Sequence, residues 1–184
     1  MPRANSFKSG ISDYTEELLP ELSKEAALDV FIDGAYTPSK TDLPAQCRII
    51  AFDPDGFKPE GYDAILYHMG NKYDAHMYIY ESMKRFPGIV VLHDYVMQGF
   101  YAERFVATGD FQPYQELLEK YYGEKGREIA RSIKDRSPVP IWESPEAIQF
   151  PLCEEIVAHA RGVIVHSGFI LDRIRPLTDA PIAV

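Results

Sequence analysis

Short apolar runs of strand length alternate along this chain with longer amphipathic stretches. Several runs are β-branched and lack polar alternation, as in Ile-Val-Val-Leu at 89–92, which is typical of strands buried on both faces of a parallel sheet. The runs cover residues 28–33, 48–53, 64–68, 89–93, 162–166 and 181–184. The pattern therefore predicts an α/β protein with a mostly parallel sheet.

The stretches between these runs predict the flanking helices. Residues 12–26 carry apolar side chains at four-residue spacing, and Asp13 with Glu16 resembles an N-cap and its reciprocal partner. Further helices are expected over 74–86, over 150–160, and after Ser167, whose side chain can cap the last of them.

No strand-like run occurs between His93 and Gly162. The segments 95–108, 113–122 and 124–136 instead predict a helical insertion between two strands, spanning about residues 95–149. Its aromatic residues fit either an apolar acceptor surface or ordinary core, and core is the favoured interpretation; they are Tyr95, Phe100, Tyr101 and Phe105.

Length and composition indicate one globular domain over residues 1–184. The net charge of −9 repels nucleic-acid phosphates, so a nucleic-acid partner is not expected. Cys47 and Cys153 lie far apart and indicate free thiols in a reducing compartment. The expected location is the cytoplasm, with peripheral attachment at the inner face of the membrane left open.

Histidines gather where an active site of a parallel sheet is expected, at the carboxyl ends of strands. His68, His93 and His166 each end a predicted strand. His93, followed by Asp94, is the best single candidate for proton transfer or hydrogen bonding near neutral pH. A strand-end histidine bonded to the backbone is the equal alternative.

The segment after the third run offers a second polar group. His68 and Asn71 flank Gly70, and His76 lies early in the next predicted helix. These residues fit a polar rim for a hydroxylated ligand, although turn and capping roles are favoured. The histidine spacing matches no metal-binding motif, so no metal site is expected.

Gly10 and Ile11 precede the first predicted helix, where backbone N–H groups and the helix dipole favour phosphate. The pattern is neither a Walker loop nor a dinucleotide fingerprint, and an ordinary helix start is the favoured alternative.

Taken in order, four segments resemble motifs of the bacterial family 4 glycosyltransferases. Residues 9–18 (SGISDYTEEL) resemble the glycine loop and first helix of that family. The other three segments are 67–71 (YHMGN) with His76, 87–94 (PGIVVLHD) and 160–167 (ARGVIVHS).

The resemblance implies the first, acceptor-side half of a GT-B fold, with two Rossmann-like domains around a cleft and the donor-binding C-terminal domain absent here. It implies a nucleotide-sugar donor as co-substrate, no cofactor or metal, and retention of configuration. The acceptor would be a glycan, a lipid-linked sugar or a small metabolite. Gly10 and Ile11 would approach the donor diphosphate, and His93 would act at the transferred sugar. The remaining cleft residues would be Asp13, Tyr14, His68, Asn71, His76, Asp94 and Ser167.

Two departures from the family stand out. The family has an apolar strand in the middle of the sheet before the glycine loop, and residues 1–7 cannot supply it. Its loss would leave unpaired edges and favour association between copies. The chain also stops where the family's last first-domain strand begins. Two alternatives stay open: a non-catalytic sugar- or partner-binding module, and an unrelated hydrolase, which lacks a GxSxG elbow.

Overall fold

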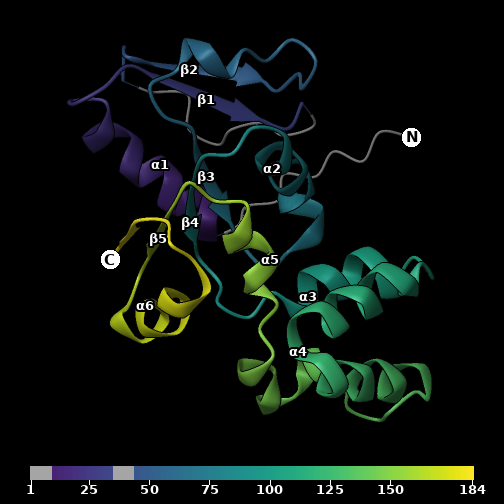
Figure 1. Ribbon diagram of the computed structural model, residues 1–184. Helices are drawn as coiled ribbons and strands as arrows, with labels where there is room; N and C mark the ends of the chain where they lie inside the picture. The colour runs from purple at the N-terminus through teal and green to yellow at the C-terminus, as the bar shows by residue number, and fades with distance from the viewer. Residues whose placement is uncertain (1–9, 35–43) are drawn as a thin grey trace. The chain divides into compact units, whose positions relative to one another are not determined.

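The computed structural model describes residues 10–34 and 44–184, and these form two compact α/β units (Figure 1). The first unit is Met1–Asp63 and the second is Ala64–Val184. The α/β class with parallel sheets is confirmed. The segment 1–7 and Ser9 of the glycine loop lie outside the described residues, and the expectation of a single domain stays a prediction.

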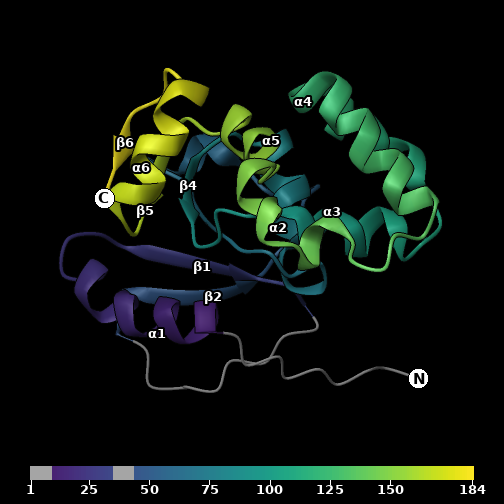
Figure 2. The same ribbon diagram turned by 90° about the horizontal axis from the view of Figure 1, so that it is seen from below.

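The first unit is built on a pair of parallel strands, β1 (Leu28–Ile32) and β2 (Cys47–Ala51). Figure 2 shows helix α1 (Gly10–Leu22) running along this pair. A short 3₁₀ turn, η1 (Pro59–Gly61), follows. Four aromatic rings pack mainly edge to face with centroids 5.1–5.9 Å apart and form the apolar part of this unit; they are Phe31, Phe52, Phe57 and Tyr62.

The second unit holds a four-stranded parallel sheet in the order β3-β4-β5-β6. Its strands are β3 (Leu66–Met69), β4 (Ile89–Leu92), β5 (Gly162–Val165) and β6 (Ile182–Ala183). The helices α2 (Tyr73–Arg85), α5 (Cys153–Ala158) and α6 (Gly168–Ile174) connect them, and the turn η5 (Arg175–Leu177) follows α6. The core lies between sheet and helices, because Met69, Leu92 and Val165 of the strands are buried together with Met83 and Ile156 of the helices.

The predicted helical insertion between β4 and β5 is confirmed, and it lies to one side of the sheet (Figure 1). It begins with α3 (Gln98–Tyr101), the π-helical turn η2 (Ala102–Val106) and α4 (Phe111–Lys134). Two 3₁₀ turns, η3 (Ile141–Glu143) and η4 (Pro145–Gln149), lead back to α5. Phe100 and Tyr101 are at most 1% exposed, so the core interpretation holds for both.

Helix α4 is a hairpin of two helices that meet at Gly123, as the break between residues 122 and 124 predicted. Gly123 has φ 57° and ψ −127°, a conformation that glycine adopts without a steric penalty. A Cβ on Gly126 would lie 2.0 Å from the Leu118 carbonyl oxygen, which shows how closely the two arms approach. Lys134 of the second arm donates a 2.7 Å hydrogen bond to Gln115 of the first.

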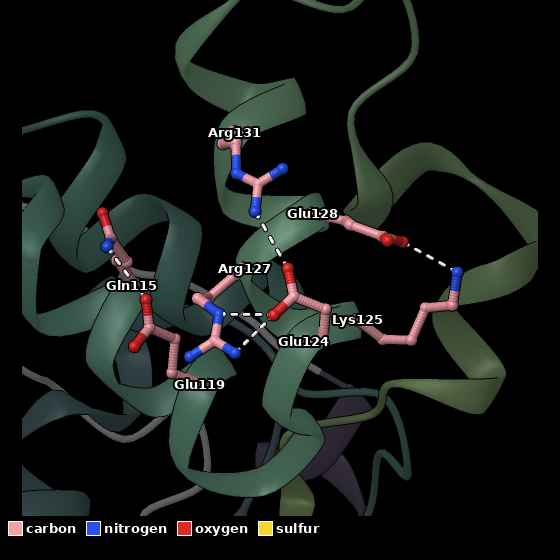
Figure 3. Close-up of polar contacts among 7 residues, drawn as sticks. All are labelled: Gln115, Glu119, Glu124, Lys125, Arg127, Glu128 and Arg131. Carbon is pink, nitrogen blue, oxygen red and sulfur yellow. Dashed lines mark hydrogen bonds and ion pairs between the residues drawn. The ribbon is translucent and has the colours of Figure 1, made fainter.

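The exposed side of this hairpin is held by surface ion pairs (Figure 3). Glu124 accepts hydrogen bonds from Arg127 and, at 3.0 Å, from Arg131, while Lys125 pairs with Glu128 at 2.7 Å. Exposed pairs of this kind contribute about 0.2–1 kcal/mol each to stability, so their effect on the hairpin is small.

A buried amide joins the helices of the insertion to the segment that precedes α5. Gln98 is fully buried; its Oε1 accepts a hydrogen bond from the Tyr114 hydroxyl and its Nε2 donates to the Phe150 carbonyl. The Tyr122 hydroxyl accepts a 2.6 Å hydrogen bond from the backbone N–H of Leu152. These bonds fix α3 and α4 against the segment that enters α5.

Several helix boundaries differ from the sequence predictions, and helix α1 ends at Leu22 instead of residue 26. Helix α1 begins at Gly10, so Asp13 lies inside its first turn and is not an N-cap. The N–H groups of a first turn have no intrahelical partner, so glycine costs little there. Helix α3 begins at Gln98 instead of residue 95. Helix α5 begins at Cys153 because Leu152 adopts φ 57°, which interrupts a helix predicted from residue 150.

Candidate functional site

Three histidines stand in a row at the carboxyl ends of β3, β4 and β5. The sheet register pairs Met69 with Leu92 and Leu92 with Val165. The residues that directly follow these three are therefore side by side across the strands; they are Gly70, His93 and His166. Because side chains alternate between faces, His68, two residues before Gly70, lies on the same face as the other two. Gly70 has no side chain, so the ring of His93 can lean toward His68.

The three rings are in hydrogen-bond contact. His68 Nδ1 lies 3.0 Å from His93 Nε2, and His93 Nδ1 lies 3.3 Å from His166 Nε2. The ring centroids are 5.3 Å and 4.8 Å apart. Both ring nitrogens of His93 therefore face another imidazole. We call His68, His93 and His166 the histidine row.

The environment keeps the inner two rings uncharged. Burial, followed by the charges of neighbouring imidazoles, lowers the pKa of His68 to about 4. Burial and the charge of His166 lower the pKa of His93 to about 4, although the carboxylate of Asp94 opposes this. Both side chains are thus neutral imidazoles at neutral pH, each with one donor and one acceptor nitrogen.

Asn71 and Asp94 connect the loops around the row through hydrogen bonds. The Asn71 backbone N–H donates a 2.8 Å hydrogen bond to the Asp94 carboxylate, and Asn71 Oδ1 accepts one of 2.8 Å from the Phe100 N–H. A Cβ on Gly99 would lie 3.0 Å from the Asn71 amide nitrogen, so the fit is close. These contacts join the ends of β3 and β4 to the start of α3, which makes Asn71 and Asp94 supports of the row.

His76 and Ser167 also bond to the backbone. His76 is buried on α2, and its Nδ1 donates to the Lys72 carbonyl oxygen at 2.8 Å. Burial lowers the pKa of His76, so this ring is neutral as well. Ser167 Oγ accepts a 3.3 Å hydrogen bond from the Ile170 N–H, which confirms the predicted cap of α6.

The expected phosphate-loop residues lie in the first unit. Gly10 and Ile11 are the first two residues of α1, and Gly10 is exposed, with open space where a Cβ would stand. Asp13 is half-buried in the same helix and Tyr14 is exposed. The predicted site residues therefore divide between the two units, and the histidine row belongs to the second.

Sequence reasoning left His166 out of its chosen site residues. Its place after the strand 162–165 was the same signal that selected His93. What the sequence lacked was the pairing of β4 with β5, which brings the two rings to the same level.

The first unit also holds a hollow of about 430 Å³ that the sequence did not indicate. Asp29, Phe31, Arg48 and Ile50 line one face of β1–β2 beside it. Arg48 donates two hydrogen bonds, of 2.7 and 2.6 Å, to the Asp29 carboxylate and lowers the pKa of that group. The charges of Asp29 and Arg48 thus neutralise each other. The opposite charges of Asp29 and Arg48, each near the start of a predicted strand, were the available signal.

Within residues 10–34 and 44–184, no group of three or more His, Cys, Asp or Glu side chains has a geometry that could hold a metal ion. No helix in the same ranges is both long enough and apolar enough to cross a bilayer. Comparison with protein-family models, curated proteins and solved structures finds no match to this chain.

Proposed function

We propose that this chain is the acceptor-side domain of a nucleotide-sugar-dependent glycosyltransferase, with the histidine row in the acceptor site. One observation supports the proposal more than any other: three imidazoles in contact at the carboxyl ends of adjacent parallel strands, the inner two of them neutral. Ligands of open parallel sheets bind at these ends. The four ordered motifs of family 4 glycosyltransferases support the same assignment.

The chemistry of glycosyl transfer suits a neutral imidazole. The acceptor hydroxyl loses its proton as it joins the anomeric carbon of the sugar, and the diphosphate leaves with the electron pair of the broken bond. A neutral histidine can accept that proton at physiological pH, whereas a protonated one cannot. The first turn of α1, at Gly10 and Ile11, offers backbone N–H groups suited to a diphosphate. In this proposal transfer retains configuration and needs no metal.

A non-catalytic sugar-binding module is the second candidate. It is favoured by the contacts of His93, because both of its ring nitrogens already face imidazoles. A ring so engaged can hold a binding surface together without meeting a reacting atom.

A donor screen separates the two candidates. The product of the complete reading frame is incubated with a panel of nucleotide sugars and with glycan, lipid-linked and small-molecule acceptors, and products are identified by mass spectrometry. A transferase forms a glycosylated product with at least one donor. A binding module binds acceptor-type sugars and forms no product with any donor.

The 184 residues alone provide the control. We expect no transfer from them, since the proposal assigns most donor contacts to a second domain. Clear transfer by these residues would contradict that assignment.

A further inference from the structure

The histidine row differs from three separate side chains because His93 connects the other two through opposite ring nitrogens. Its Nε2 faces His68 and its Nδ1 faces His166. His166 is exposed, while His93 and His68 are partly buried. The row therefore has a solvent-facing end and an inner end.

We propose that the histidine row is a proton relay in which His166 exchanges the proton with the ligand and His93 passes it to His68. The inference rests on the proposed function only for the source of the proton, which would be the acceptor hydroxyl. The relay itself depends on the contacts between the three rings.

Two arrangements satisfy both contacts with all three rings neutral. In the first, every ring carries its proton on Nε2, so His166 donates to His93 Nδ1 and His93 donates to His68 Nδ1. In the second, every ring carries its proton on Nδ1, and both hydrogen bonds run in the opposite direction.

The passage of one proton along the row interconverts the two arrangements. Starting from the first, His166 Nδ1 accepts a proton from the ligand, and His166 passes its Nε2 proton to His93 Nδ1. His93 passes its own Nε2 proton to His68 Nδ1, and the partly exposed His68 releases its Nε2 proton to a water molecule. One proton enters, one leaves, and the row ends neutral in the second arrangement. The three rings together carry three N–H protons before and after the passage, so the number of protons on the row is conserved.

Burial, with smaller effects of nearby charges, keeps the two inner rings of the row neutral. The titratable groups that act on His68 and His93 are the other rings of the row, His76 from α2, and Asp94 after β4. Burial disfavours a positive charge on His68 and on His93, while Asp94 favours one beside His93. Asp94 thus offsets part of the cost of a proton that passes through His93.

The same geometry argues against a metal site. Three imidazoles that bind one ion must aim a lone pair each at a single point. His93 instead uses its two nitrogens toward opposite neighbours, so the rings form a line with no common point.

The experiment is NMR of the chain labelled with ¹⁵N-histidine. The chain contains only five histidines, so each ring can be assigned. It measures the tautomer of each ring and the rate at which the His93 ring N–H exchanges with water. The first variant is His166→Phe, which replaces the outer imidazole by a ring without nitrogen. The second is His166→Gln, which keeps a hydrogen-bonding group but cannot relay a proton. His159→Phe, at the residue that follows α5 and lies outside the row, is the matched control.

The relay predicts that the His93 ring proton exchanges at least tenfold more slowly in both His166 variants and at the wild-type rate in His159→Phe. Unchanged exchange in His166→Phe and His166→Gln would overturn the relay. Because no donor or acceptor is present, this result is independent of the transferase assay: a functioning relay with no transfer would count against the proposed function alone.

Discussion

The neutral state of His68 has a consequence for stability that can be measured without a substrate. Burial lowers the pKa of His68 from 6.5 to about 4 in the folded protein. A histidine with a depressed folded pKa contributes stability above its unfolded pKa, and this contribution is lost as the pH falls toward the folded value. Between pH 7.5 and pH 5, the linkage relation gives a loss of about 2 kcal/mol from this residue alone.

The assay is urea unfolding at pH 7.5 and pH 5, followed by the fluorescence of Trp142, the single tryptophan, which lies in the second unit. Wild type is compared with His68→Gln, whose side chain does not titrate. We expect the free energy of unfolding to fall about 2 kcal/mol further in wild type than in the variant. Glu154, whose pKa is raised by burial, acts in the opposite direction but equally in both proteins. A difference below about 0.5 kcal/mol would refute the reasoning that burial holds this ring neutral.

Three further predictions concern the fold around the row. Gly126→Ala places a Cβ 2.0 Å from a backbone oxygen of the facing helix, so it should lower the free energy of unfolding in urea by about 3 kcal/mol. The control Gly168→Ala has open space around its Cβ and should lower that free energy by less than about 1 kcal/mol. Equal losses in the two variants would contradict the close approach of the hairpin arms. Gln98→Leu leaves the buried Tyr114 hydroxyl and the Phe150 carbonyl without this partner and should destabilise by about 2–3 kcal/mol, against little change for exposed Gln112→Leu. A stable Gln98→Leu protein would show that those bonds make no net contribution to stability. Ser167→Ala removes the cap of α6 and should lower the unfolding free energy by about 1 kcal/mol, with no change if the cap contributes no stability.

Local patterns predicted most of the elements. The apolar runs predicted the six strands of the described residues to within two residues at either end. The lack of a strand-like run between 93 and 162 predicted the insertion. The two arms of α4 followed from the glycine at 123, since that position needs a positive φ. Helix starts were less accurate, because the conformation of Leu152 is set by its hydrogen bond to Tyr122 thirty residues away.

The site was predicted in outline only. Sequence placed three histidines at strand ends, but the contacts between their rings depend on the pairing of β3, β4 and β5, which is not local. The same limit applies to Asn71 and His76. Their positions suggested a ligand rim, while the structure gives each of them backbone partners instead.

The central claim is that the histidine row serves glycosyl transfer, and one measurement tests it most directly. The initial rate of sugar transfer is compared between the product of the complete reading frame and its His93→Ala variant, with His159→Ala as the matched control. General acid–base contributions are typically about 10²–10⁴-fold, so His93→Ala should lower the rate at least about 100-fold with little loss of stability, and His159→Ala should leave it within about twofold. Near-normal transfer by His93→Ala would contradict the account.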